Sequence, residues 1–296
     1  MNDLRFVILA LALCSLMLLA GCGTTLKPPE QTQSAALADS VDARQQVESF
    51  FSDFDRFLAD NVDAQGRLDY GVLKRDPRAI NALYTTVAAI SPDSHPEAFP
   101  TEAHRLAWWI NAYNAATIYA VVQAYPIETV LEVRPASIFT VIDKRGGFFA
   151  GQRLVFGGEA ISLYKLENDV IRKRFIDPRY HFAVNCASIG CPILPAEAFL
   201  PDTLDAQLER ETLAFLKRAQ NYRIDHDAQV IRLSSIYGWY DKDYLKWLEE
   251  VRGFDDPELL DYVTLYLEEA EAAKLAQVRD TYALEFIDYD WGLNDR

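Results

Sequence analysis

The stretch from His181 to Pro192 (HFAVNCASIGCP) contains the strongest candidates for reactive side chains in this sequence. A cysteine thiol becomes a strong nucleophile when a nearby base removes its proton and a third group orients that base. Cys186 with His181 supplies the first two groups, and Glu167 or Asn185 could supply the third. Because side chains alternate between the faces of a strand, Cys186 and His181 meet only if the chain folds back. One hypothesis is therefore a cysteine hydrolase or transferase.

The same segment supports a second hypothesis, a disulfide between Cys186 and Cys191, which we favour. These are the only cysteines of the chain after Cys22. An exported bacterial protein enters an oxidising compartment, and a loop of this length closes once the two Cα atoms lie within about 7 Å. His181 would then be a hydrogen-bonded strand residue. A redox-active disulfide is a third alternative, although the spacing differs from the Cys-x-x-Cys of thioredoxin-like sites.

Metal binding is a weaker hypothesis for these side chains. Two cysteines and His181 would give three ligands, but the cysteines are further apart than in most structural zinc sites. Four aspartates are candidates for a calcium site or a polar cleft: Asp241, Asp243, Asp288 and Asp290. A solvated acidic face explains them better in a chain with this acidic excess. We therefore expect no metal and no cofactor.

Three asparagines, Asn111, Asn114 and Asn185, are candidate binding residues. Asn111 and Asn114 lie three positions apart, on one face of a predicted helix. They belong to the segment Leu106–Ile127, which has no charged residue. An unpaired buried amide costs about 1–3 kcal/mol, so these amides need partners. We favour a role in holding a loop backbone, such as that of His181–Cys191, over contact with a ligand.

The amino-terminal segment predicts export and lipid attachment. Phe6 to Ala20 is almost purely apolar, and 15 residues of helix span about 22 Å, which is short of the roughly 30 Å bilayer core. Leu19-Ala20-Gly21-Cys22 resembles the bacterial lipoprotein box, which implies that Cys22 carries fatty acyl chains such as palmitate. Gly23, in place of Asp, favours the outer membrane. We expect a signal peptide over 1–21 and a lipidated, flexible tether over 22–40.

The composition excludes several classes of protein. The 29 basic and 44 acidic residues give a formal net charge of −15, which argues against nucleic acid as a partner because phosphates would be repelled. Half of the residues are hydrophobic, as in an ordinary globular protein. We expect the membrane to be contacted through the lipid on Cys22, with the protein in the cell envelope and facing the periplasm.

The remaining residues, 41–296, predict a single globular α+β domain that is mostly helical and has a small antiparallel sheet. The uncharged helix is interpreted as a central core helix capped by Thr101, because its internal polar residues argue against a membrane span. Further helices are expected over 41–60, 162–175 and 204–219. Strands are expected at 180–184, within 148–156, at 222–224 with 230–233, and at 282–287.

Four motifs in this order resemble the family called domain of unknown function 547. They are Trp109–Ala115 (WINAYNA), Leu163–Glu167 (LYKLE), His181–Pro192 and Asp288–Asn294 (DYDWGLN). The resemblance covers roughly Trp108 to Asn294, and it implies a shared fold without an established activity. Papain-like and transglutaminase-like sheets are compatible with the predicted elements by analogy alone.

Two functions follow as expectations. The first is a lipid-anchored envelope module, binding or structural, whose partner is a peptide, a glycan or a protein. The alternative is a cysteine hydrolase or transferase that acts on an envelope peptide or amide, with Cys186 as nucleophile, His181 as base and Glu167 as the orienting group.

Overall fold

The computed structural model describes residues 24–29, 40–134 and 146–296. The predicted signal peptide and the lipidation site Cys22 lie outside the described residues. The described part of the chain is a mostly helical α+β domain, as the sequence predicts.

The helices and turns are α2 (Ser40–Asn61), α3 (Tyr70–Arg75), α4 (Arg78–Ala89), η2 (Pro96–Ala98), α5 (Glu102–Ala124), η3 (Val130–Glu132), η6 (Gly147–Gly151), α6 (Leu163–Lys165), η7 (Leu166–Ile171), α7 (Arg172–Arg174), η8 (Pro178–Phe182), α8 (Leu204–Leu216), α9 (Ser235–Trp239), α10 (Asp241–Glu250), α11 (Leu259–Leu265) and α12 (Glu269–Val278). The strands are β1 (Thr25–Leu26), β2 (Arg153–Phe156), β3 (Glu159–Ile161), β4 (Tyr222–Asp225), β5 (Val230–Ser234) and β6 (Ala283–Ile287).

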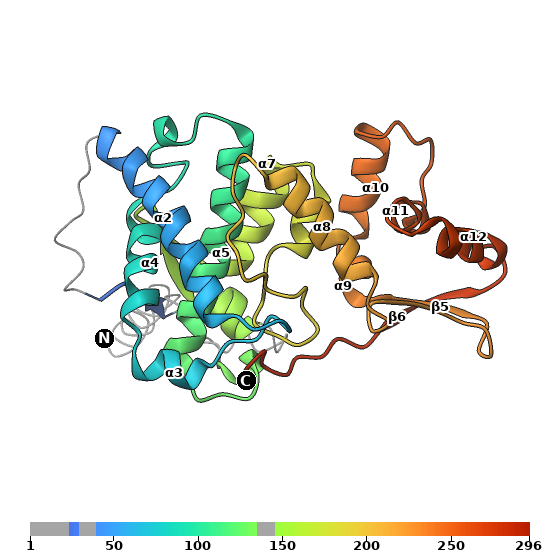
Figure 1. Cartoon of the computed structure of the whole chain (residues 1–296), viewed down its shortest axis with the longest axis horizontal. Coiled ribbons are helices and arrows are strands. Elements are labelled where there is room, and N and C mark those ends of the chain that lie inside the picture. The colour runs from blue at the N-terminus through green and yellow to red at the C-terminus, as the bar shows by residue number, and fades with distance from the viewer. Residues whose placement is uncertain (1–23, 30–39, 135–145) are drawn as a thin grey trace, which may run out of the picture.

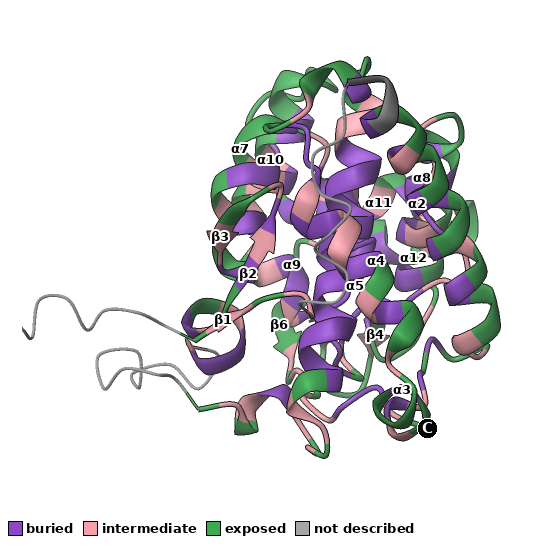
Figure 2. Cartoon of the chain, turned by 90° about the vertical axis from the view of Figure 1, so that its left-hand side faces the viewer, coloured by how far each residue is buried: buried purple, intermediate pink, exposed green. Residues whose placement is uncertain are grey.

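Helix α5 is the centre of the larger hydrophobic core. Every residue from Leu106 to Val122 is buried, and the Thr101 side chain caps the helix by accepting the backbone N–H of His104. Helices α2 and α4 lie beside it (Figure 1), and buried positions run through the middle of the domain (Figure 2). The helix is apolar on all sides because protein surrounds it. Within the described residues, no helix has the length and apolarity needed to cross a membrane.

A second hydrophobic core lies at the other end of the molecule, where α8 to α12 pack around the sheet of β4, β5 and β6 (Figure 1). The predicted hairpin of 222–224 with 230–233 is confirmed as β4 and β5, and β6 joins β5 in parallel. The other sheet is also mixed, because β2 pairs antiparallel with β3 and parallel with β1. The expected small antiparallel sheet is thus two hairpins, each extended by one parallel strand.

Two local predictions are wrong. The segment expected as a strand at 180–184 begins with η8, a 3-10 helix in which Pro178 presets the backbone and the Asp177 side chain accepts the N–H of Arg179. The segment expected as a hairpin within 148–156 begins with a π-helical turn, η6. The actual hairpin, β2–β3, turns at Gly157 and Gly158, whose φ angles of 57° and 88° suit glycine.

The beginning of the predicted tether is attached to the domain. Strand β1 pairs with β2, and the backbone N–H of Arg153 donates to the Thr24 carbonyl at 2.9 Å. The Tyr84 hydroxyl donates to the Leu26 carbonyl at 2.8 Å. Similarly, the Tyr119 hydroxyl donates to the Lys27 carbonyl at 2.8 Å. Residues 24–29 therefore differ from the flexible tether that their polar composition predicts.

Candidate functional site

The segment that carries the predicted site, 181–192, crosses the junction of the two cores. Tyr180 and Ala183 belong to the core around α5, whereas Phe182, between them, belongs to the core around the β4–β6 sheet. His181 lies at the same junction and is 2% exposed. A change in the packing of either core would therefore act directly on this segment.

Two of the candidate asparagines fix the backbone of this segment. Asn114, on α5, donates its amide to the Ala183 carbonyl at 3.0 Å and accepts the Asn185 backbone N–H at 2.8 Å. Asn185 in turn donates to the Pro192 carbonyl and accepts the Ala187 N–H, both at 2.8 Å. Because these amides are buried and already paired with backbone, they position the loop and leave little capacity for a ligand.

Asn111 does the same for a different segment. Its amide donates to the Phe199 carbonyl at 2.7 Å and accepts the Phe199 N–H at 3.0 Å. Thus both asparagines of the uncharged helix hold backbone, in the role that the sequence analysis favours, although only Asn114 holds the 181–192 segment.

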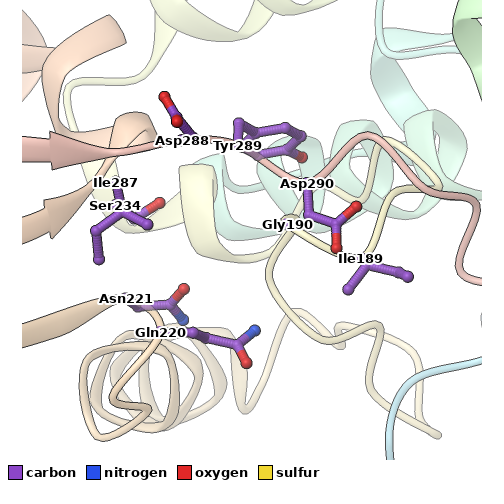
Figure 3. Close-up of a pocket in the computed structure, with 9 residues that line it drawn as sticks. All are labelled: Ile189, Gly190, Gln220, Asn221, Ser234, Ile287, Asp288, Tyr289 and Asp290. Atoms are coloured by element: carbon purple, nitrogen blue, oxygen red, sulfur yellow. The ribbon is translucent and has the colours of Figure 1, made fainter.

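The closing segment, 288–294, covers the loop from the other side. The N–H of Ile189 donates to the Gly292 carbonyl at 2.8 Å, and the N–H of Gly190 donates to the Asp290 carbonyl at 2.9 Å. A Cβ on Gly190 would lie 2.9 Å from the Asp290 nitrogen, so this close approach requires glycine. Figure 3 shows the two segments beside a small pocket of about 150 Å³, with Tyr289 following Asp288 along the closing segment.

Cys186 and Cys191 form a disulfide, with their Cα atoms 6.2 Å apart. Cys191 is 4% exposed, whereas Cys186 is partly exposed. The Tyr289 hydroxyl lies 2.8 Å from the Cys186 sulfur, and the backbone N–H of Cys186 donates to the Cys191 sulfur at 2.9 Å. In this state Cys186 has no free thiol to act as a nucleophile.

His181 is paired with a carboxylate instead of a cysteine. Its Nε2 lies 2.8 Å from Asp243 on α10, which also receives two hydrogen bonds from Arg172, at 2.7 and 2.9 Å. Burial raises the pKa of Asp243, but hydrogen bonds from His181 and Arg172 outweigh it and lower that pKa to about 2. Since the ionised carboxylate can only accept, Nε2 of His181 must carry the proton.

The other ring nitrogen of His181 faces Glu167. Burial lowers the pKa of the imidazole to about 4, so the ring is neutral near pH 7 and Nδ1 has a lone pair. Nδ1 makes no hydrogen bond among the described residues, and Glu167 Oε1 lies 3.9 Å away. Burial also raises the pKa of Glu167, although a hydrogen bond from Tyr240 opposes this. The Tyr240 ring stacks on the imidazole at a centroid distance of 3.8 Å.

Above this network lies an open cleft of about 580 Å³. Its polar lining comes from Glu167, Asn168 and Arg172, and Cys186 contributes its partly exposed side chain. Aromatic rings make most of the remaining wall: Tyr113, Phe149, Tyr164, Trp239, Tyr240 and Trp291. Trp239 and Trp291 are nearly parallel, with centroids 5.9 Å apart. A cleft of this size and composition suits a ligand with flat or apolar groups.

The structure thus brings Glu167 and Cys186 to one cleft, and places His181 beneath Glu167. It gives neither nitrogen of His181 a hydrogen bond to sulfur. Arg172, Trp239 and Tyr240 also line the cleft without belonging to any of the four motifs, whereas Trp291 belongs to the aromatic closing motif. Of the four aspartates considered for calcium, Asp243 is held in the ion pairs described above. The described residues contain no group of three or more acidic, cysteine or histidine side chains arranged to hold a metal ion.

The model of the family described as Protein of unknown function, DUF547 matches residues 97–216. The resemblance predicted from the motifs is confirmed for this stretch, which includes α5, Glu167, His181 and both cysteines. It ends before α9, α10 and the closing segment, which supply Trp239, Asp243 and Tyr289. No curated protein and no solved structure matches the chain.

Proposed function

We propose that this protein is a lipid-anchored binding module of the bacterial envelope, attached through Cys22 to the outer membrane and facing the periplasm. Its cleft takes an uncharged peptide segment with apolar or aromatic side chains. The observation that carries this proposal is the aromatic wall of the cleft, in which the polar side chains of Arg172 and Asn168 already have hydrogen-bond partners.

That pairing favours a peptide over a glycan. Arg172 uses Nε and one terminal nitrogen on Asp243, and the other terminal nitrogen on Asn168. Asn168 donates its own amide to the Tyr164 carbonyl at 2.9 Å. A sugar that entered the cleft would lose the hydration of its hydroxyls and find few free partners, which is costly. Apolar side chains of a peptide would instead gain by leaving water.

The net charge of the chain restricts the class of ligand further. At a formal net charge of −15, the protein repels anionic ligands at long range. Within the cleft, the guanidinium of Arg172 is neutralised by Asp243. The charge therefore argues against an anionic segment, and the aromatic wall favours an apolar one.

The attachment of residues 24–29 supports a position close to the bilayer. Thr25, the first residue of β1, is three residues after Cys22, a distance of at most about 10 Å along the chain. If Cys22 is acylated, the domain lies against the membrane surface instead of moving on a long tether. Phe149 of the cleft wall belongs to η6, immediately before β2, the partner of β1. This part of the cleft wall is thus close in sequence to β2, the strand that pairs with the anchored strand β1.

Binding is preferred to hydrolysis because both groups of the proposed catalytic pair have other partners. Cys186 is bonded to Cys191, and His181 donates to Asp243. Cys186 therefore lacks both a free thiol and a hydrogen-bonded base.

Peptide binding is tested by titrating the full-length protein with a library of short peptides and with envelope oligosaccharides, using tryptophan emission as the signal. Tyr164, 56% exposed, lines the cleft, and Phe254, 36% exposed, is absent from its lining. We expect Tyr164→Ala to weaken peptide binding about 2- to 12-fold, since an aromatic contact contributes about 0.5–1.5 kcal/mol. Phe254→Ala should change nothing. Binding of oligosaccharides without peptides, or equal effects of the two variants, would contradict the proposal.

The lipid anchor is tested separately, by feeding cells labelled palmitate. The wild-type chain should incorporate the label and fractionate with the outer membrane, whereas Cys22→Ser should do neither. Label in the Cys22→Ser chain, or an unprocessed and unlabelled wild-type chain, would disprove acylation at this residue.

A further inference from the structure

The two sulfurs of the Cys186–Cys191 disulfide differ in access. Cys186 is partly exposed on the wall of the 580 Å³ cleft, whereas Cys191 is 4% exposed and borders a pocket of about 80 Å³. Thiol–disulfide exchange begins when a thiolate attacks one of the two sulfurs, and access decides which. We propose that this disulfide exchanges with cysteine-bearing peptides that enter the cleft, and that Cys186 is the sulfur attacked.

The loop does not depend on the disulfide for its shape. A bridge between residues only five apart closes a short loop and removes less entropy from the unfolded chain than a bridge across a longer loop. The loop backbone is already held by Asn114 and Asn185, and by the closing segment through Ile189. The surrounding structure can therefore keep both sulfurs in place when the bond between them is broken.

A hydrogen-bond donor is directed at each sulfur. The Cys186 backbone N–H points to the Cys191 sulfur at 2.9 Å, where it would stabilise a thiolate leaving from Cys191. The Tyr289 hydroxyl lies 2.8 Å from the Cys186 sulfur. Since a disulfide sulfur carries no hydrogen, the hydroxyl is the donor, and it would stabilise a thiolate on Cys186 in the reduced form.

The residue after Cys186 has an unfavourable backbone conformation. Ala187 has a φ of 59°, in the left-handed region that non-glycine residues seldom adopt. It is held there by Asn185, which accepts its N–H at 2.8 Å, and by Asn294, whose N–H donates to its carbonyl at 3.2 Å. Such conformations are maintained only where the surroundings impose them, and they gather at functional sites. Here the strain lies beside the accessible sulfur.

The reaction balances without a cofactor. A peptide thiolate attacks the Cys186 sulfur, a new disulfide forms between them, and the Cys186–Cys191 bond breaks with its electron pair on Cys191. A second thiol of the peptide, once deprotonated, attacks the peptide sulfur of this mixed disulfide and releases Cys186 as a thiolate. The peptide dithiol is thereby oxidised to a disulfide and the cysteine pair is reduced, with the two thiol protons passing to Cys186 and Cys191. The reverse exchange with a disulfide-bearing partner restores the pair.

The choice of a peptide as partner rests on the proposed function, whereas the reactivity of the disulfide does not. The first test therefore uses glutathione disulfide, which needs no peptide binding. Full-length Cys191→Ser and Cys186→Ser proteins are incubated with it and analysed by mass spectrometry, after far-UV circular dichroism has confirmed that both are folded. With the modified residue located by peptide mapping, because Cys14 and Cys22 are also present in the full-length chain, we expect Cys186 of Cys191→Ser to form the mixed disulfide at least ten times faster than Cys191 of Cys186→Ser.

Wild-type protein provides a measurement that is independent of how the variants fold. Dithiothreitol should reduce the native disulfide without denaturant at a rate within about tenfold of the rate in urea. Resistance to reduction in the native state, or equal reactivity of the two cysteines, would show a purely structural disulfide and overturn the proposal. A cysteine-bearing apolar peptide should react faster than glutathione. If the two cysteines differ as expected but the peptide reacts no faster than glutathione, the disulfide exchange is supported and the proposed peptide binding is contradicted.

Tyr289→Phe tests the hydroxyl as a positioning group. In the reduced protein, the rate of Cys186 alkylation against pH reports the pKa of its thiol. Loss of the donor should move the midpoint of that profile to higher pH, because the thiolate loses a hydrogen bond. A purely structural hydroxyl would leave the midpoint unchanged while lowering the unfolding midpoint in urea.

Discussion

Replacing Asn114 with alanine should destabilise the domain strongly, through the backbone of the 181–192 segment. Asn114 is 2% exposed and makes two hydrogen bonds, one to the Ala183 carbonyl and one from the Asn185 N–H. In Asn114→Ala both backbone groups stay buried without a partner, and each such group costs about 1–3 kcal/mol. The free energy of unfolding should therefore fall by about 2–6 kcal/mol. This is a large share of the roughly 5–15 kcal/mol that stabilises a domain.

The assay is urea unfolding of the full-length oxidised protein, followed by far-UV circular dichroism. Asn61→Ala is the matched control, because Asn61 donates a single hydrogen bond to the Phe57 carbonyl and is only partly buried. Water can replace that bond, so the control should lose no more than about 1 kcal/mol. Unchanged slopes of the two transitions would show that the denatured states are comparable. If Asn114→Ala loses no more than Asn61→Ala, the segment is not held by α5 and our account of the site is wrong.

Three further outcomes are expected. Burial lowers the pKa of His181 to about 4 from the 6.5 of an unfolded histidine, so its contribution to stability is present above pH 6.5 and lost as the pH falls towards 4. In urea titrations, the free energy of unfolding of the wild-type protein should decrease by about 3 kcal/mol over this pH range, and that of His181→Gln should decrease by less. Equal decreases in the two proteins would contradict the lowered pKa of His181. Gly190→Ala should lower the free energy of unfolding by about 1–3 kcal/mol, since its Cβ meets the Asp290 backbone; an unchanged free energy would refute that contact. Tyr84→Phe should speed proteolysis within residues 24–29, because the strand loses the hydrogen bond at Leu26; equal cleavage rates would refute the attachment.

Local sequence patterns were sufficient for much of the fold. The uncharged run after Thr101 predicts a buried, capped helix, and its asparagines predict the hydrogen bonds to backbone that α5 makes. Apolar alternation around a turn predicts β4 and β5. Two cysteines five positions apart predict the disulfide. Each of these features depends on residues that are close in the chain. The sequence therefore shows it directly, as a periodicity or a spacing of residues.

The site itself depends on residues that are distant in sequence. His181 meets Asp243, 62 positions later, and Cys186 meets Tyr289, 103 positions later. The strand predicted at 180–184 is wrong partly for the same reason, because residues of this segment pack into two different cores. The Asp177 cap favours the 3-10 helix locally. The sequence alone therefore determined the buried helix after Thr101, the β4–β5 hairpin and the pairing of Cys186 with Cys191. Only the tertiary structure decided that His181 lies beneath the cleft and that Cys186 opens into it, because burial and long-range contacts set the partner of each polar group.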